Sequence, residues 1–505
     1  MNNLFFTRVL GLSIFHHIDS ASQNQPRIPE FRGEIPERKA FDKRKLWLLI
    51  NMKILVAGCG KIGTTILSSL TAEGHDVTAL DSDPAVIAEI TNIYDTMGMV
   101  GNAADCETLA EAGVDAADVF IAVTGSDEQN MLSCFLARRM GARHTVARIR
   151  NPEYNDNSLG FMCRELNLSL AINPEKLAAH ELYNMLKLPS ALKVETFSGQ
   201  NMEMIEVRLK QDSPLDGMRL SDMRVKYNRA KFLVCFVQRE EEVFIPDGNF
   251  ELKSGDKIGM TAAPAEFQKL LRDLGLTQKQ ARSVMLLGGS RTAYYLAKHL
   301  TDTGNDVKII ERDEAHCETL SDLLPRAVIL HGDGTNQELL MEEGLASTDA
   351  FVSLTGMDEQ NILISIFAAA QNVPKVITKI NRAELEDMAD KLGLDSVIAP
   401  RRTVSDRLVS YVRALSNSRG SHIETLYRLA DDKAEALEFT VSPDARCIGI
   451  PLRQLQMKPG ILIAGIIRRH TPIIPTGNDS ILSGDRVIVI SAKERLQDLS
   501  DIMRD

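Results

Sequence analysis

The sequence predicts an α/β protein with two tandem Rossmann-like, doubly wound parallel-sheet domains, each followed by a small α+β domain. Three observations lead to this fold class. The second half of the chain repeats motifs of the first half, strands and helices alternate where each half begins, and a strand-rich stretch closes each half. Alternating strands and helices are typical of parallel sheets covered by helices on both faces.

The repeat is visible at three places. KILVAGCGKIG (53–63) returns as VMLLGGSRTAYY (284–295), VTGSDEQN (123–130) as LTGMDEQN (354–361), and IPDGNFELKSGDKI (245–258) as IPTGNDSILSGDRV (474–487). A chain of 505 residues is long enough for several domains, each with its own core. The repeat therefore indicates a duplicated unit.

The elements of the first half follow from apolar runs separated by turn residues. Gly74 ends the first helix, and Pro84 suits the first turn of the second helix. Strands are predicted at 53–58, 76–81, 97–100, 118–125 and 144–150, with helices at 61–74, 84–94, 107–113 and 128–141.

A further helix over 174–188 carries Ala178, Leu182, Met185 and Leu186 on one face, and Pro189 ends it. The stretch 193–274 is rich in strands and turn residues. The second half repeats this order, with its own long helix at 400–415. The predicted domains are 52–190, 191–275, 282–415 and 434–505.

Residues 1–51 belong to neither repeat. The segment 23–46 is rich in proline and charge, as linkers are, and Met52 directly precedes the first strand. We expect this extension to be dispensable, because it is either disordered or lies upstream of a translation start at Met52.

The composition argues against several classes of function. A net charge of −11 disfavours nucleic acid and anionic lipid as direct partners. No apolar run approaches the roughly 18–20 residues that span a bilayer. Seven cysteines without CxxC pairs indicate reduced, buried thiols of a cytosolic protein, and no metal-ligand spacing appears.

The strongest chemical signal is Gly58-x-Gly60-x-x-Gly63, which follows a strand and opens a helix. The first glycine allows a tight turn, the second admits a pyrophosphate and the third lets helix and strand pack closely. Asp81 lies at the end of the next strand, where a carboxylate binds a ribose diol. An empty strand–helix turn is the alternative interpretation.

The residues around Asp81 also indicate which dinucleotide is bound. The run Asp81-Ser82-Asp83 is acidic and lacks arginine, so it would repel a 2′-phosphate. The sequence therefore favours NAD over NADP.

The second copy of the motif is altered. Gly288 is kept, Ser290 and Ala293 replace the later glycines, and Glu311 supplies the carboxylate. Arg291 and Arg312 add positive charge where phosphates would lie. The sequence predicts NAD(H) or ATP/ADP here, and the alternative is a retained fold with an empty pocket.

Two further features lie at the carboxyl edge of each predicted sheet. Thr124 and Gly125, repeated as Thr355 and Gly356, would lie beside the nucleotide, although the same loop also serves as a capping turn through Ser126 or Asp127.

Arg148 ends the fifth strand, and Lys379 is its counterpart. Either cation would meet a phosphate or remain a solvated charge at the strand end. We find no acid–base pair at telling positions, so the sequence predicts no catalytic residues.

These motifs resemble the regulator-of-potassium-conductance (RCK) domain family. The resemblance rests on KILVAGCGKIG, Asp81, TGSDEQN, ARIRNPEY (147–154) and INPE (172–175), followed by a crossover helix. The strand-rich segments at 193–274 and 434–505 resemble the C-terminal companion domain. Two such pairs in one chain are similar to the peripheral subunits of bacterial Trk potassium-uptake systems.

The resemblance implies a nucleotide-sensing, homo-oligomeric cytosolic ring that gates a membrane potassium transporter of the Trk type and lies peripherally on the inner face of the cell membrane. It implies NAD(H) at the first site and NAD(H) or ATP/ADP at the second, with crossover helices at 174–188 and 400–415. The implied site residues are Gly58, Cys59, Gly60, Lys61, Ile62, Gly63, Asp81, Thr124, Gly125 and Arg148, then Gly288, Gly289, Ser290, Arg291, Thr292, Glu311, Thr355, Gly356 and Lys379.

Two alternatives stay open. An NAD-dependent oxidoreductase with a duplicated dinucleotide-binding fold would also carry these motifs, as would a nucleotide-binding scaffold with no role in transport. The duplicated nucleotide site without repeated catalytic residues favours the regulator.

Overall fold

The computed structural model describes residues 51–504, except for residues 155, 200, 212, 275–279, 417–421, 431 and 493. The predicted N-terminal extension, up to residue 50, lies outside the described residues. The description therefore begins next to the first strand.

The first sheet is parallel and has the strand order β3-β2-β1-β4-β5-β6. This order reverses between β1 and β4, which is where open α/β sheets bind ligands. Its strands are β1 (Lys53–Ala57), β2 (Asp76–Asp81), β3 (Met97–Val100), β4 (Val119–Ala122), β5 (His144–Arg148) and β6 (Leu170–Ile172). Its helices are α2 (Lys61–Ala72), α3 (Pro84–Ile93), α4 (Cys106–Glu111), α5 (Asp127–Met140) and α6 (Asp156–Glu165).

The second parallel sheet repeats this topology, in the order β14-β13-β12-β15-β16-β17. Its strands are β12 (Ser283–Leu287), β13 (Asp306–Glu311), β14 (Val328–His331), β15 (Ala350–Ser353), β16 (Lys375–Lys379) and β17 (Val397–Ile398). Its helices are α10 (Arg291–Asp302), α11 (Glu314–Leu323), α12 (Gln337–Glu342), α13 (Asp358–Ala370) and α14 (Ala383–Lys391).

Each parallel sheet is followed in sequence by an antiparallel five-stranded sheet, in the orders β10-β9-β11-β8-β7 and β18-β19-β22-β20-β21. The first contains β7 (Lys193–Phe197), β8 (Met202–Arg208), β9 (Phe232–Arg239), β10 (Glu242–Phe244) and β11 (Lys257–Ala262), with α8 (Leu220–Lys226) and α9 (Pro264–Asp273). The second contains β18 (His422–Leu429), β19 (Ala434–Thr440), β20 (Ile461–Arg468), β21 (Thr471–Ile473) and β22 (Arg486–Ser491). The predicted fold class is confirmed.

The two antiparallel sheets share a buried core. Phe197 and Phe236 of the first sheet pack with Ala464 and Ile488 of the second. The hydroxyl of Thr261 donates a hydrogen bond to the carbonyl of Ala464 at 2.7 Å, so the polar group buried in this seam has a partner.

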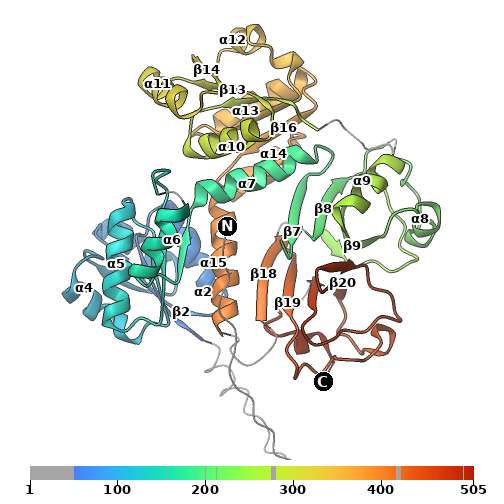
Figure 1. The fold of residues 1–505 in the computed structure, drawn as a ribbon, viewed down its shortest axis with the longest axis horizontal. Helices are drawn as coiled ribbons and strands as arrows, with labels where there is room; N and C mark the ends of the chain where they lie inside the picture. Colours follow the sequence, from blue (N-terminus) through green and yellow to red (C-terminus); the bar gives the residue numbers. More distant parts are fainter. Residues whose placement is uncertain are drawn as a thin grey trace, which may run out of the picture. The chain divides into compact units, whose positions relative to one another are not determined.

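Two long helices connect the halves (Figure 1): α7 (Pro174–Lys187) and α15 (Pro400–Ser416). The apolar face of α7, including Leu182 and Met185, is buried against Leu296 and Leu300 of α10. The apolar face of α15 is likewise buried against α2 in the first half. Each helix therefore packs on the half to which it does not belong in sequence. The predicted domain boundaries stay predictions.

A buried ion network lies where α2 ends. The Nε and Nη2 of Arg413 donate to the carboxylate of Glu73 at 2.7 and 2.8 Å, and its Nη1 and Nη2 donate to Glu435 at 3.0 Å. The side chains of Arg413 and Glu73 are 4% and 6% exposed, so solvent screens this attraction little. The network joins the end of α2, α15 and the last antiparallel sheet.

All seven cysteines are free, and Cys106 is exposed. The prediction that the thiols are buried was therefore wrong for Cys106, because it is the first residue of the short helix α4 and not part of an apolar face, and Cys163 is only partly buried. No helix in the described part of the chain is long and apolar enough to cross a membrane.

We predict that Arg413→Met lowers the stability of the chain by about 3–5 kcal/mol, because it removes the hydrogen-bonded cation from the carboxylates of Glu73 and Glu435 and leaves Glu73 with the more distant Arg428 and Arg495 at 3.7 and 3.8 Å. The loss is measured as a lower thermal midpoint. Arg143→Met is the matched control, since Arg143 is 76% exposed in its pair with Asp118 and surface pairs contribute little. Equal midpoints for both variants would contradict the importance of the network.

Candidate nucleotide-binding site

The glycine-rich loop after β1 is shaped by close backbone contacts. Gly58 has a φ of +92°, which favours glycine. A Cβ on Gly63 would lie 1.9 Å from the carbonyl oxygen of Gly58, so helix α2 packs against the loop more tightly than any larger residue allows. Gly60, in contrast, has no atom within 4 Å of the position of a Cβ. The second glycine therefore faces open space.

That open space lies at the start of α2. Gly60 is the N-cap of α2, and no side chain caps its first turn. The first backbone N–H groups of a helix lack intrahelical partners and carry the positive end of its dipole. This arrangement suits a phosphate group.

Asp81 at the end of β2 is held beside the loop. Its carboxylate accepts hydrogen bonds from the backbone N–H groups of Cys59 at 2.6 Å and Asp83 at 3.0 Å. The Cys59 side chain is buried in the core, and burial raises the pKa of its thiol to about 12. Cys59 therefore contributes its backbone to the loop, not a reactive sulfur.

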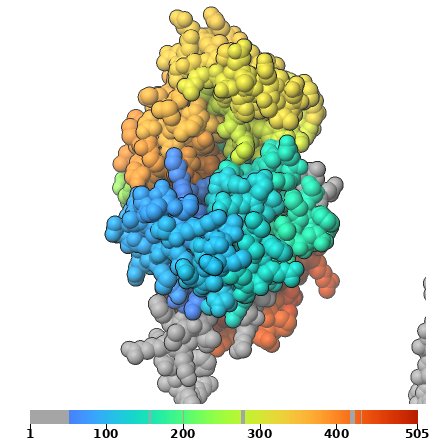
Figure 2. Space-filling model, turned by 90° about the vertical axis from the view of Figure 1, so that its left-hand side faces the viewer, coloured from blue at the N-terminus to red at the C-terminus, as the bar shows by residue number. Residues whose placement is uncertain are grey.

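A cavity of 780 Å³ lies over this loop, and residues of both halves line it. In Figure 2 the residues around the first parallel sheet are blue to teal and those around the second are yellow to orange. The second half contributes Ser290, Arg291, Thr292, Lys379, Asn381, Pro400 and Arg401.

The charges around this first cavity are mostly positive. Its lining contains five cationic side chains and two acidic ones, Asp81 and Glu175. The five cations are Lys61, Arg148, Arg291, Lys379 and Arg401. Burial and the neighbouring Arg150 lower the pKa of Arg148, and burial lowers that of Lys379. An anionic ligand would stabilise the charged form of both groups.

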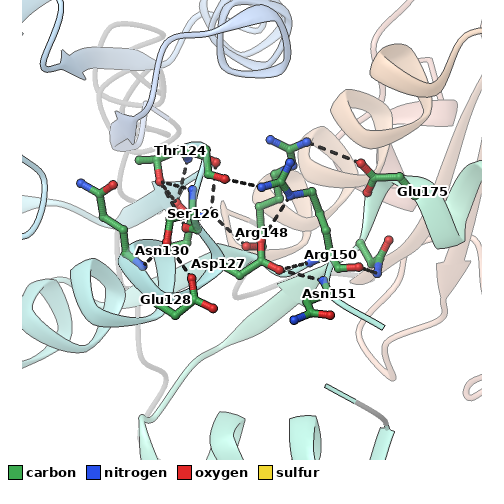
Figure 3. A network of polar contacts seen from close by, with 12 residues as sticks. Thr124, Ser126, Asp127, Glu128, Asn130, Arg148, Arg150, Asn151 and Glu175 are labelled. Carbon is green, nitrogen blue, oxygen red and sulfur yellow. Dashed lines mark hydrogen bonds and ion pairs between the residues drawn. The ribbon is translucent and has the colours of Figure 1, made fainter. Parts of the chain in front are cut away.

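The repeated TGSDEQN loop is held by a polar network (Figure 3). The backbone N–H of Thr124 donates to Asn130 Oδ1 at 2.8 Å. The carboxylate of Asp127 accepts from the backbone N–H groups of Arg150 and Asn151, both at 2.7 Å. Ser126 caps α5, as one interpretation of the sequence required.

The second copy shows which part of this loop is kept. Asn361 accepts from the N–H of Thr355 at 3.0 Å, and Asp358 accepts from the N–H groups of Asn381 and Arg382 at 3.0 and 3.1 Å. Met357 replaces the serine, and no side chain caps α13. The repeated feature is therefore the Asn and Asp clamp between the loop and the next strand, not the cap.

A separate second cavity of 390 Å³ lies over the glycine loop of the second half. Glu311 accepts from the N–H groups of Gly289 at 2.6 Å, Arg312 at 2.8 Å and Asp313 at 2.9 Å. Burial opposes ionisation of Glu311, but these bonds outweigh it and its pKa lies below the ordinary value. His316 Nε2 lies 2.6 Å from the carbonyl oxygen of Gly289.

The altered glycines change the start of α10. The hydroxyl of Ser290 accepts from the N–H of Ala293, so a side chain partly satisfies the helix start that is uncapped in α2. A Cβ on Gly288 would lie 3.2 Å from Thr355 N, whereas one on Gly58 would lie 2.6 Å from Thr124 N. The loop of the second copy therefore packs less closely.

The structure distributes the predicted site residues unequally. The first cavity is lined by Gly58, Gly60, Lys61, Ile62, Asp81, Thr124, Gly125 and Arg148, and also by Arg291, Thr292 and Lys379, which were predicted for the second site. The second cavity is lined by Gly288, Gly289, Glu311, Thr355 and Gly356, and Ser290 borders both. Cys59 and Gly63 are buried behind the first loop.

Sequence reasoning missed three ionisable residues of these cavities. Glu175 and Arg401 line the first cavity because α7 and α15 begin at the seam between the halves. His316 lines the second, at the position of Val86 in the first half. Only His316 carried a usable signal, because its ring lies five residues after Glu311, the carboxylate predicted to bind a ribose.

The chain matches two domain models, each twice. The TrkA-N domain matches residues 54–163 and 284–400, and the TrkA-C domain matches residues 204–275 and 436–504.

Several curated proteins are similar over most of their length. A Trk system potassium uptake protein TrkA homolog of Archaeoglobus fulgidus is 30% identical over 453 residues, which covers 90% of this chain and 100% of that protein. The Trk system potassium uptake protein TrkA of Halomonas elongata is 28% identical over 457 residues, with coverage of 90% and 99%.

Solved structures share the fold. The GsuK channel superposes with a TM-score of 0.59 at 16% identity, covering 91% of this chain and 78% of that chain. The GsuK channel bound to NAD superposes with a TM-score of 0.58, also at 16% identity and with the same coverage.

The two inner glycines are predicted to respond differently to alanine. Gly63→Ala is expected to lower the thermal midpoint strongly, because its Cβ would meet the carbonyl of Gly58 at 1.9 Å. Gly60→Ala should cost about 1 kcal/mol or less, yet weaken NADH binding, because its methyl group enters the cavity. Calorimetric NADH titration and thermal unfolding of both variants measure this. Undiminished NADH affinity in Gly60→Ala would contradict the placement of the ligand.

Proposed function

Because this chain belongs to the TrkA family, we propose that it is a nucleotide-sensing regulatory subunit that gates a membrane potassium-uptake transporter. The resemblance to the RCK family is confirmed by the two pairs of matched domains. The observation that carries the proposal is the first cavity, whose lining comes from both halves. A ligand that contacts both halves binds one arrangement of them better than another and so shifts their equilibrium.

We assign NAD(H) to the first cavity. The uncapped start of α2 and the open face of Gly60 suit a pyrophosphate, and Asp81 is fixed where it can accept from a ribose diol. The volume of 780 Å³ is within the range of cofactor sites. The similar fold of a channel solved with NAD supports the same ligand class.

The second cavity would take a smaller ligand, ATP or ADP, or NAD(H) weakly. It has half the volume of the first, and Ser290 already accepts from an N–H at the helix start. Glu311 accepts hydrogen bonds from three backbone N–H groups, and the ring of His316 lies beside the glycine loop, 2.6 Å from the carbonyl oxygen of Gly289. Arg312 adds a positive charge for a phosphate-rich ligand.

The proposal extends to partner and place. Membership in a family named for potassium uptake supports a Trk-type transporter subunit as partner and a homo-oligomeric ring as assembly. The chain would then lie in the cytoplasm, peripherally on the inner face of the cell membrane, through that partner.

An oxidoreductase is the weaker alternative. Among the described residues, the lining of the first cavity contains no histidine, tyrosine or cysteine to relay a proton to a substrate. Of the two lysines in this lining, Lys61 and Lys379, the second donates to the carbonyl of Leu354 at 3.1 Å.

The first test distinguishes regulator from enzyme. We expect the chain to co-purify with a Trk-type potassium transporter and to change potassium flux into vesicles in a nucleotide-dependent manner. We expect no consumption of NADH with 2-hydroxy acids or amino acids as substrates. Catalytic NADH consumption without any effect on potassium flux would favour the oxidoreductase.

The second test addresses the asymmetry between the two cavities. Asp81→Ala should weaken NADH binding by about 1.5–3 kcal/mol, the range for a hydrogen bond to a charged group, whereas Glu311→Ala should mainly affect ADP. Asp76→Ala, at the exposed opposite end of β2, is the matched control. If Glu311→Ala abolishes NADH binding and Asp81→Ala does not, or if NADPH binds better than NADH, the assignment is reversed.

A further inference from the structure

An incompletely satisfied ion pair lies in the wall of the first cavity. Arg148 Nη2 lies 3.6 Å from Glu175 Oε1, longer than a charge-assisted hydrogen bond (Figure 3). The side chains are 13% and 19% exposed. The buried atoms Arg148 Nε and Glu175 Oε2 have no hydrogen-bond partner among the residues that the structure describes. Leaving buried charged groups partly unsatisfied is costly, so this pair is poised to exchange partners.

Each member of the pair has a second partner within the cavity. Arg148 ends β5 and lines the cavity next to the glycine loop, where a phosphate would satisfy its free Nε. Glu175 lies in the first turn of α7 and shares the cavity with Lys379 of the second half. Among the described residues, the largely buried ammonium of Lys379 donates to one carbonyl, that of Leu354. The charge of Asp358 acts on this ammonium, and that of Glu175 acts on it more weakly.

We propose that Glu175 is an internal competitor for the anion site: a bound phosphate takes Arg148 from Glu175, and Glu175 turns to Lys379. This inference rests on the proposed nucleotide site and assigns its regulation. In the structure Glu175 links α7 to the strand end of the first half. After the exchange it links α7 to the strand end of the second half, so an anionic ligand strengthens the connection between the halves.

The location of α7 explains why the exchange reaches beyond the cavity. Asn173 caps α7, and its Nδ2 donates to the hydroxyl of Tyr295 on α10 at 3.1 Å, while that hydroxyl donates to the carbonyl of Arg150 at 3.1 Å. The start of α7 is therefore attached to both halves within three residues of Glu175. A change of partner at Glu175 acts directly on this junction.

The test is a double-mutant cycle on the full chain, with NADH and ADP as calorimetric probes. Glu175→Gln should tighten both probes roughly three- to tenfold, because Arg148 loses its competitor. Glu175→Asp, whose shorter side chain reaches Arg148 less well, should tighten them less. Glu181→Gln, which removes a carboxylate bonded to Thr403 further along the same helix, should leave both affinities unchanged.

A variant of Lys379 distinguishes the proposed exchange of partners from a direct contact between Lys379 and the ligand. Lys379→Met should weaken both probes in the original chain, because Glu175 loses its alternative partner, and should have little effect once Glu175→Gln is present. Equal weakening in both backgrounds would show that Lys379 holds the ligand itself and would overturn the exchange.

The remaining outcomes are also distinct. If the original chain binds NADH or ADP and Glu175→Gln fails to tighten either, the exchange is wrong and the proposed function stands. If the original chain binds neither, the proposed function fails, and the exchange fails with it.

Discussion

The packing of each crossover helix, α7 and α15, on the opposite half of the chain is the constraint on which the rest of this structure depends. The apolar face of α7 is buried against α10, and that of α15 against α2, so each half completes a hydrophobic core of the other. Burial of apolar surface is the main favourable term in folding, and it acts here between segments more than 100 residues apart. The two halves therefore share hydrophobic cores, although their parallel sheets are separate.

This packing also creates the first cavity. Helices α2, α7, α10 and α15 all begin at the seam between the halves, and the first residues of each line the cavity. Five cations face two acids in this space, and burial lowers the pKa of at least Arg148 and Lys379. Such a concentration of positive charge is unfavourable without a counter-ion and favourable with a polyanion. The helix packing that stabilises the fold thus also forms a cavity whose positive charge favours an anionic ligand.

The two copies differ more at the positions that face the cavities than in the hydrogen bonds that close their loops. The Asn130 and Asn361 clamps have the same geometry, and in both copies a loop N–H donates at 2.6 Å to the carboxylate that ends the second strand. The helix start differs: it is uncapped at Gly60 and capped by Ser290 in the second copy. A single substitution in a hydrogen bond that closes a loop leaves a buried polar group unpaired. A substitution at a position that faces the cavity does not.

The sequence by itself determined the fold class, the duplication and the glycine loop and carboxylate that line the first cavity. Strand–helix alternation, the Gly58–Gly63 spacing and Asp81 are local signals, because backbone conformation and close approach act over a few residues. Tertiary structure alone decided that Arg291, Thr292 and Lys379 line the first cavity, and that Glu175 and Arg401 join them. These residues meet because α7 and α15 each pack on the opposite half. The helical spacing of apolar residues does not indicate which of two equivalent apolar surfaces a helix will cover. Both surfaces offer the same hydrophobic pattern, and only shape complementarity distinguishes them.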